Sequence, residues 1–324
     1  MGNAVAERKK GFSGSVNTTK KKSLFNKIIE QRELLLMSVP LLLYRILFSY
    51  VPITGWSMAF QDFKPGRDFF DQTWVGLKHF RFLFENENFI RAIRNTLAMS
   101  VINLVLGYFC AILLALMLNE IKKGIFFKRL VQNVSYLPHF LSWIIVAGLV
   151  SNALSTENGI INEALMFLNI IDQPILFLGT PNYFWGIVAG SHLWKGVGWN
   201  SIIYLAAMTA IDPCLYEAAD IDGANRYQKM WNITLPGIKP TIIILLIMSI
   251  GNILEAGFEI QYFLGNGLVI EFSETIDIFV LKYGIKLANF SLATAGGIFK
   301  TIVSFILLGA ANYIAGRLGE EKLV

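Results

Sequence analysis

One stretch of the chain, EAADIDGANRYQKMWNITLP at residues 217–236, carries the side chains whose types and spacing most strongly indicate a function. Glu217 offers a carboxylate to a basic partner, and the small Ala218 and Ala219 let another surface approach closely. We expect these residues to dock a partner protein and not to catalyse a reaction. The residues of the pattern are Glu217, Ala218, Ala219, Gly223, Ile233, Leu235 and Pro236.

Two short helices joined by a turn, at residues 212–236, must position this pattern. Asp212 is a good N-cap and Pro213 suits a first helical turn, so they predict the start of the first helix. Gly223 permits the left-handed backbone that ends this helix, and Leu235 with Pro236 is expected to turn the chain after the second. The alternative is an amphipathic hairpin at the membrane surface without a protein partner.

The sequence contains no pattern typical of nucleotide or metal binding. The nearest imitation of a GxxxxGK[ST] loop, at residues 296–301, has the wrong spacing and lies in an apolar run. The histidines and cysteines lack ligand spacing, so we expect no catalytic residue, metal or cofactor on this chain. Any energy source must then be a separate chain. These residues are His79, His139, His192, Cys110 and Cys214.

The composition indicates an all-α integral membrane protein. Of the 324 residues 54% are hydrophobic, and the mean hydropathy is +0.52. A soluble fold buries only one apolar stripe per helix, and this length allows about six spans of about 20 residues with no separate soluble domain. Apolar runs predict the spans at residues 34–53, 96–118, 130–150, 183–208, 241–264 and 291–314.

The basic residues are distributed unevenly about these spans. Eight of the 28 lie in residues 1–32, a tail without apolar periodicity that we expect to be disordered and cytoplasmic. In that orientation seventeen lie on the inner side and eight on the outer side, as the positive-inside rule requires, so the net charge of +5 reflects topology and not nucleic-acid binding. Both termini and the 212–236 hairpin are then cytoplasmic. The membrane domain covers residues 33–320, with extracytoplasmic segments at 56–95, 151–182 and 265–290.

Several polar residues inside the predicted spans are candidates for a translocation path, because a central charge costs about 2.5–3.5 kcal/mol on insertion scales and should face a wet cavity or a partner. Asn252, Glu255 and Glu259 share one face of the fifth span. The fourth span carries a second polar face, and its glycines permit a break that could line a cavity. The candidates are Arg45, His192, Trp194, Lys195, Trp199, Asn252, Glu255 and Glu259, with the neighbouring glycines Gly196 and Gly198.

These polar residues also have structural interpretations. Lys195 can pair with Glu255 or Glu259. Arg45 and Lys300 can extend to the membrane interface or pair across a subunit boundary. The tryptophans can stack on sugar rings, or serve as packing and interfacial anchors.

The 217–236 pattern resembles the EAA loop of permease subunits of type I ABC importers. Other patterns, from about residue 34 to the C-terminus, resemble the subfamily for multiple-sugar and polysaccharide-fragment uptake. They include Asn95, Thr96 and Leu97; Leu137, Pro138, His139 and Phe140; Gly257, Phe258, Glu259 and Tyr262; and Glu271, Ser273, Ile276 and Asp277.

The resemblance implies a six-helix permease in the bacterial inner membrane that forms a heterodimer with a second, homologous permease. It further implies two ATPase subunits that bind ATP and Mg, and an extracytoplasmic solute-binding protein. Glu217 would lie near a basic residue of the ATPase, and Gly223 would form the hairpin turn. The transported solute would be an oligosaccharide, and acidic fragments of alginate or pectin are among the substrates of such importers. Transport would occur by alternating access.

Two other functions stay open from the residues alone. A secondary transporter that uses Glu255, Glu259 and Lys195 as an ion relay explains the charges in the spans but not the hairpin. An ABC permease for a non-sugar solute shares the hairpin and differs only in its cavity.

Overall fold

The computed structural model describes residues 31–121 and 124–317 and divides into two compact units, Met1–Gly55 and Trp56–Val324. Helices dominate the described residues, which also contain one two-stranded sheet. Apart from its last two residues, the tail predicted at residues 1–32 lies outside the described part of the chain.

The described part of the N-terminal unit is helical throughout. The helix α2, Arg32–Arg45, continues through a π-helical turn, Ile46–Tyr50, into a 3-10 helix, Val51–Phe60. The Val51 N–H bonds to the carbonyl of Ile46, five residues back, which widens the helix just before Pro52 and relieves the clash that a proline ring makes one turn earlier. None of the α2 side chains is buried within this chain.

A small folded cap opens the second unit. Strand β1, Gln61–Asp62, pairs antiparallel with β2, Thr73–Trp74, and helix α3, Lys78–Glu85, follows. The Gln72 side-chain amide donates to three backbone carbonyl oxygens of the connecting loop, at 3.1–3.3 Å. The loop is therefore held by one side chain and not by strand pairing alone.

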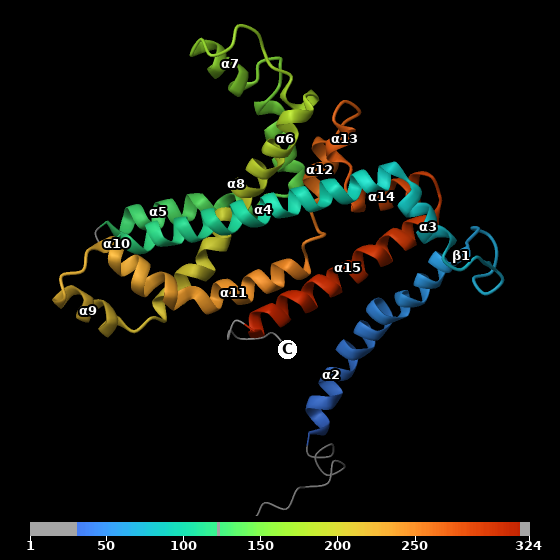
Figure 1. The fold of residues 1–324 in the computed structure, drawn as a ribbon, viewed down its shortest axis with the longest axis horizontal. Coiled ribbons are helices and arrows are strands. Elements are labelled where there is room, and N and C mark those ends of the chain that lie inside the picture. The colour runs from blue at the N-terminus through green and yellow to red at the C-terminus, as the bar shows by residue number, and fades with distance from the viewer. Residues whose placement is uncertain (1–30, 122–123, 318–324) are drawn as a thin grey trace, which may run out of the picture. The chain divides into compact units, whose positions relative to one another are not determined.

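Four long helices form the body of the second unit (Figure 1). They are α4, Glu87–Glu120; α8, Pro181–Thr209; α11, Leu235–Gly251; and α15, Phe290–Arg317. The helix α4 packs along α8, and α11 packs against both α15 and α8. At one of these contacts the small Ala111 and Ala115 of α4 pack with Tyr204 of α8, which lets the helices approach closely.

The count of membrane spans agrees with the sequence. Four helices of the described residues are long and apolar enough to cross a membrane, and the number reaches six if each of two bent pairs is one span. The four are Arg32–Phe60, Glu87–Glu120, Arg226–Gly251 and Phe290–Arg317, and the bent pairs are Ile125–Phe140 with Trp143–Ala153 and Pro181–Thr209 with Pro213–Ile221. The all-α membrane fold is confirmed, and the six predicted spans agree with the upper end of this count.

Two of the predicted spans are not straight helices. The third consists of α5, Ile125–Tyr136, a 3-10 turn, Leu137–Phe140, and α6, Trp143–Ala153, with a bend of 105°. The fifth was predicted as one helix over 241–264, which is wrong. The helix α11 ends at Gly251, and a separate helix, α12, covers Phe258–Leu264. Gly257 has φ +78°, a left-handed conformation that interrupts a right-handed helix.

The segments predicted to lie outside the membrane contain short helices. Segment 151–182 holds α7 and a 3-10 turn, and segment 265–290 holds α13, α14 and a π-helical turn. The helix α14 packs on α4 and α15, so this second segment is part of the helical body and not a free loop. The bounds are α7, Ile160–Phe167; Phe177–Gly179; α13, Ile270–Ser273; α14, Ile276–Leu281; and Lys282–Lys286.

Candidate functional sites

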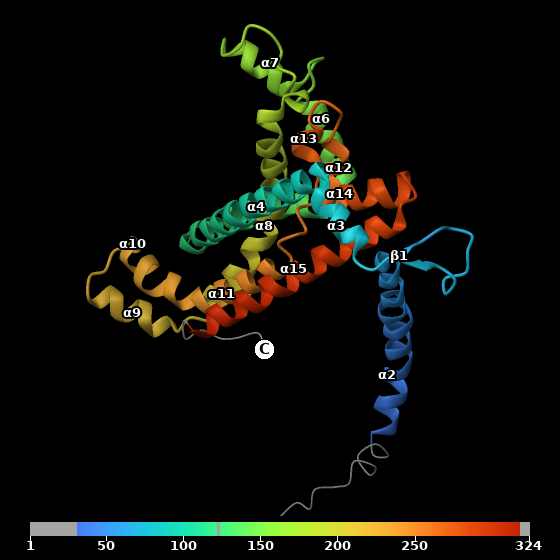
Figure 2. The same cartoon turned by 45° about the vertical axis from the view of Figure 1, so that its right-hand side comes forward.

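The 212–236 hairpin projects beyond the ends of α8 and α11, away from α12–α14 (Figure 1, Figure 2). Its first helix, α9, spans Pro213–Ile221, and the Asp212 carboxylate accepts the Cys214 N–H at 2.9 Å. Gly223, with φ +75°, follows the end of α9. The predicted N-cap, first-turn proline and glycine turn are all confirmed.

The second helix of the hairpin differs from the prediction at its end. A capping box between Asn225 and Gln228 starts α10, Arg226–Lys229, which continues as a π-helical turn, Met230–Thr234, directly into α11. Leu235 and Pro236 therefore do not turn the chain. The Leu235 N–H bonds to the Met230 carbonyl five residues back, and this wider turn accommodates the proline within a continuous helix.

Side-chain contacts join the two halves of the hairpin. Lys229 Nζ donates to Asp220 Oδ1 at 2.5 Å, and the hydroxyls of Tyr216 and Thr234 bond at 2.9 Å. The hairpin is thus one braced unit whose second half continues without a break into α11.

The exposed surface of the hairpin is more apolar than the sequence pattern suggested. Glu217 and Ala218 are exposed, whereas Ile233 and Leu235 are half-buried and serve the fold. Ile221, Tyr227 and Trp231 expose 87%, 80% and 73% of their surface. Large apolar residues gathered on an exposed element mark an interaction surface. Sequence reasoning missed these three, although an Ile and two aromatic residues in a charged hairpin were a signal.

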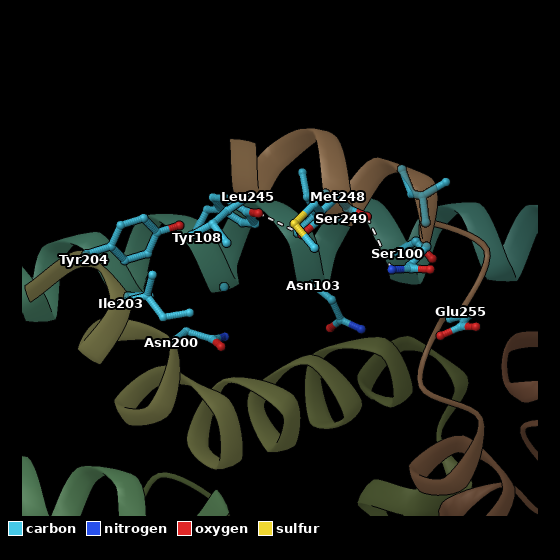
Figure 3. A pocket seen from close by; sticks show the side chains of 15 residues that line it. Ser100, Asn103, Tyr108, Asn200, Ile203, Tyr204, Leu245, Met248, Ser249 and Glu255 are labelled. Atoms are coloured by element: carbon cyan, nitrogen blue, oxygen red, sulfur yellow. Dashed lines mark hydrogen bonds between the residues drawn. The ribbon is translucent and has the colours of Figure 1, made fainter. Parts of the chain in front are cut away.

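A cavity of about 450 Å³ lies between α4, α8 and α11, and we call it the central cavity (Figure 3). Tyr108 and Ser249 bond through their hydroxyls at 2.7 Å, and Asn103 and Asn200 extend into the space from α4 and α8. Ser100 Oγ and Asn103 Oδ1 are buried without a hydrogen-bond partner in the described part of the chain. The lining therefore combines groups that both donate and accept hydrogen bonds with apolar side chains, and it carries one carboxylate, that of Glu255.

A second cavity, of about 330 Å³, adjoins the first and shares Asn103, Gly107 and Asn200 with it; we call it the lysine cavity. Lys195 exposes only 9% of its surface there. Its Nζ donates to the carbonyl oxygen of His139 at 2.6 Å and lies 5.3 Å from the centre of the Trp143 ring.

The lysine lines a cavity but does not form the ion pair suggested by the sequence. Among residues 31–121 and 124–317 no ion pair joins Lys195 to Glu255 or Glu259, so that pairing is not found. A neutral carbonyl and an aromatic face hold the cation without neutralising its charge.

The aromatic candidates Trp194 and Trp199 are both exposed but differ in their ring contacts. Trp199 stacks flat on His139, with ring centres 4.4 Å apart and planes at 2°, and Trp143 contacts His192 at 4.5 Å. Trp194 is exposed. The rings of His139, Trp143 and His192 line the lysine cavity, so aromatic groups lie next to its charge.

The glycines of α8 do not break that helix, which runs without interruption from Pro181 to Thr209. A Cβ at Gly198 would collide with the backbone of Ser135. Gly198 is therefore needed for the close approach of α5 to α8, and the prediction of a helix break is wrong.

The three polar residues predicted on one face of the fifth span do not share a helix. Asn252 and Glu255 lie in the non-helical break between α11 and α12, and Glu259 is on α12. Because the helix ends at Gly251, the periodicity on which that prediction rested does not apply. Glu255 lines the central cavity and also two further pockets on the other side of the break.

The remaining predicted cations have separate places. Lys300 on α15 bonds to both carboxylate oxygens of Asp277, at 2.7 and 2.9 Å, so its partner lies within the chain. Asp277 was missed as a partner because it falls in the segment 265–290 predicted outside the membrane. Arg45 ends α2 in the N-terminal unit, where it is exposed, and its role in a path stays a prediction.

In the described ranges, no group of three or more His, Cys, Asp or Glu side chains is placed to hold a metal ion, and both cysteines are free. The two cavities can bind a polar solute, and the hairpin can bind a protein.

Known proteins resemble the chain over most of its length. It is 44% identical over 304 residues to the polygalacturonan/rhamnogalacturonan transport system permease protein YteP of Bacillus subtilis (strain 168), covering 94% of each chain. It is 39% identical to protein LplB of the same strain, covering 90% of each. A solved chain of a bacterial alginate ABC transporter, in complex with an alginate pentasaccharide-bound periplasmic protein, matches with a TM-score of 0.86 and 38% identity over 93% of this chain and 99% of that one.

The family described as the inner membrane component of binding-protein-dependent transport systems matches residues 103–320. This match covers the lysine cavity, the central cavity except for Ser100, and the 212–236 hairpin, and it confirms the resemblance inferred from the EAA pattern. The chain is therefore a multi-pass inner-membrane permease, and it belongs to the family of binding-protein-dependent transport system inner membrane components.

Proposed function

We propose that this chain is one permease subunit of an ATP-driven importer for acidic oligosaccharides, such as fragments of polygalacturonan or alginate. The observation that carries the proposal is the 44% identity, across 94% of both chains, to a polygalacturonan/rhamnogalacturonan permease. The similarity at TM-score 0.86 to a chain of an alginate transporter supports the same class of solute.

The cavities suit a uronic acid chemically. A sugar ring presents many hydroxyls, and the amides of Asn103 and Asn200 with the Tyr108 hydroxyl can donate to and accept from them. A cation gives a uronate carboxylate a charge-assisted hydrogen bond, and Lys195 is a cation with no carboxylate within ion-pair distance in the described part of the chain.

We further propose that the energy comes from partner subunits. Two ATPase subunits bind ATP and Mg, and one of them docks on the 212–236 hairpin from the cytoplasm. Glu217 supplies a carboxylate to a basic residue of the ATPase, and Ile221, Tyr227 and Trp231 supply apolar contact area. The direct continuation of α10 into α11 supports transmission of ATPase closure into the membrane.

A second, homologous permease completes the translocation path, and an extracytoplasmic binding protein delivers the saccharide. The spans then alternate between inward-facing and outward-facing states. Glu255, in the break between α11 and α12, lies where the central cavity meets the neighbouring pockets, which supports a path along this break.

The experiment is reconstitution of the complete complex in proteoliposomes. ATP hydrolysis is measured with the binding protein and one saccharide at a time: trigalacturonate, an alginate trisaccharide and the neutral maltotriose. We expect an acidic saccharide to stimulate hydrolysis and maltotriose not to do so. Stimulation by maltotriose alone would contradict the acidic class of solute. Complexes reconstituted without the ATPase or without the second permease test the subunit composition, and we expect no stimulated hydrolysis from them.

A further inference from the structure

Asn95 and Thr96 on α4 belong to a sequence pattern that neither the hairpin nor the two cavities explain. Asn95 Nδ2 donates to the carbonyl oxygens of Glu271 at 2.9 Å and Glu274 at 3.0 Å. Thr96 Oγ1 accepts the Ile276 N–H at 3.0 Å. Residues 176 positions apart in the sequence, Asn95 and Glu271, are therefore parts of one structural unit.

These bonds satisfy backbone groups that the local helices leave unpaired. The helix α13 has four residues and α14 has six, and the ends of such short helices leave carbonyl and N–H groups without partners. Between them Glu274 and Thr275 are extended and almost fully buried. Non-helical backbone in a membrane protein is tolerated where the protein satisfies it, and the side chains of α4 do so here.

Further bonds hold α13 and the residues that join it to α14, which together we call the α13–α14 link. Arg94 Nη2 adds a second donor to the Glu271 carbonyl at 2.9 Å, and Trp185 on α8 donates its Nε1 hydrogen to the Phe272 carbonyl at 2.9 Å. The buried Glu274 carboxylate pairs with Lys282 at 2.9 Å. Side chains of α4 and α8 thus hold the α13–α14 link through hydrogen bonds to its backbone.

On its other side the same segment is tied to α15. Asp277 lies in the first turn of α14, directly after Ile276, and holds Lys300 with both carboxylate oxygens. Asp277, Lys300 and Glu255 together line two pockets of about 840 and 680 Å³ beside the α11–α12 break. Because α12 follows a non-helical break, contacts of this kind and not helix continuity set the position of α12–α14.

We propose that Asn95 and Thr96 are positioning residues of the translocation path. They hold the α13–α14 link, fix Asp277 and through it Lys300, and so tie the α4–α8 pair to α15 in the resting state. This inference rests on the proposed import function. When ATPase closure moves the spans, this tie opposes movement until the loaded binding protein has docked.

The test compares Thr96→Val, which keeps the shape and removes the acceptor, with Thr96→Ser, which keeps the hydroxyl. Each variant is measured in the complete reconstituted complex, with and without binding protein loaded with trigalacturonate. For Thr96→Val we expect basal ATP hydrolysis to rise about three- to tenfold and the stimulation ratio to fall by the same factor, the size expected for one hydrogen bond that biases a two-state equilibrium. Thr96→Ser should match the parent.

A second comparison separates positioning from simple stability. Asp277→Asn should raise basal hydrolysis like Thr96→Val, and the double variant should show no more than the larger single effect. An assembled Thr96→Val complex with the parent's stimulation ratio, with or without a lower Tm, would overturn the proposal. Additive effects in the double variant would also overturn it.

If Thr96→Val does not assemble, Arg94→Gln provides the same test. It removes the Arg94 bonds to the Glu271 carbonyl and to Asn95 Oδ1, and it leaves the two bonds that Asn95 Nδ2 donates in place, so we expect about a twofold rise in basal hydrolysis. A basal hydrolysis rate equal to that of the parent in this variant would overturn the proposal. If no saccharide stimulates the parent complex, the import function fails separately, while the basal rates of Thr96→Val and Thr96→Ser still test the tie.

Discussion

The 212–236 hairpin and the two cavities are built by interactions of different range. In the hairpin, Asn225 and Gln228 cap each other three residues apart, and Lys229 reaches Asp220 nine residues away. At the cavities, Tyr108 bonds to Ser249 across 141 residues and Lys195 to His139 across 56. The form of the hairpin therefore depends on local contacts, so under the proposed function a substitution can alter ATPase coupling or solute binding separately.

The largest expected effect breaks the hairpin and leaves the cavities intact. Gly223→Pro fixes φ near −65°, against the observed +75°, and removes the N–H that bonds to the Asp220 carbonyl. A cost of about 3 kcal/mol at this turn corresponds to more than a hundredfold shift in hairpin population. We expect saccharide-stimulated ATP hydrolysis to be lost.

The matched control is Gly223→Asn, because asparagine tolerates the left-handed conformation and nothing lies within 4 Å of the added Cβ. This variant should retain stimulation. Full stimulation in an assembled Gly223→Pro complex would show that the hairpin does not transmit the ATPase motion.

The next effect concerns selection at the lysine cavity. Lys195→Met keeps an unbranched side chain over Trp143 and removes the charge. A hydrogen bond to a charged group contributes about 1.5–3 kcal/mol, so we expect the half-saturating concentration of acidic saccharide to rise about ten- to hundredfold in ATPase stimulation. Lys195→Arg should recover most of the response, and an unchanged value in Lys195→Met would exclude the residue from solute binding.

A smaller effect measures the long-range packing that forms the cavities. Gly198→Ala places a Cβ against the backbone of Ser135, whereas Gly196→Ala has its nearest neighbour, the Asn200 side-chain nitrogen, at 3.6 Å. Overpacking costs about 1–3 kcal/mol, so Gly198→Ala should lower the Tm of the purified complex while Gly196→Ala leaves it near the parent value. Equal Tm values for the two variants would contradict the close approach of α5 and α8.

The smallest effect lies within the hairpin. Lys229→Met removes the ion pair to Asp220, whose side chain is 59% exposed, and such pairs contribute about 0.2–1 kcal/mol. The Tyr216–Thr234 bond still braces the hairpin. We expect stimulated hydrolysis within about twofold of the parent, and a complete loss would show that this one pair controls the hairpin.

The range of these interactions also explains what the sequence could predict. The Asp212 cap, the Gly223 turn and six spans follow from local pattern, because each depends on neighbouring residues. The prediction of a straight fifth span was wrong because the chain between α11 and α12 is not helical and Gly257 there has a left-handed conformation. Gly257 lies against the ring of His192 on α8, a contact that spacing does not reveal. The partner of Lys300 was missed for the same reason, since α14 returns to pack on α15 only in three dimensions.

The prolines show that even a local sequence pattern can fail to predict where a helix ends. Pro236 was expected to turn the chain, yet it follows a π-helical turn and the helix continues, as it also does at Pro52. The widened turn moves the carbonyl four residues before the proline away from the ring. A proline in an apolar run therefore does not fix a span boundary by itself.

Uptake of labelled trigalacturonate into proteoliposomes that contain the complete complex tests the central claim most directly. We expect uptake to require both the binding protein outside and ATP at the face that carries the hairpin, and to be lost in Gly223→Pro but not in Gly223→Asn. Uptake driven by a proton gradient without nucleotide, or undiminished in Gly223→Pro, would contradict an ATP-driven importer worked through this hairpin.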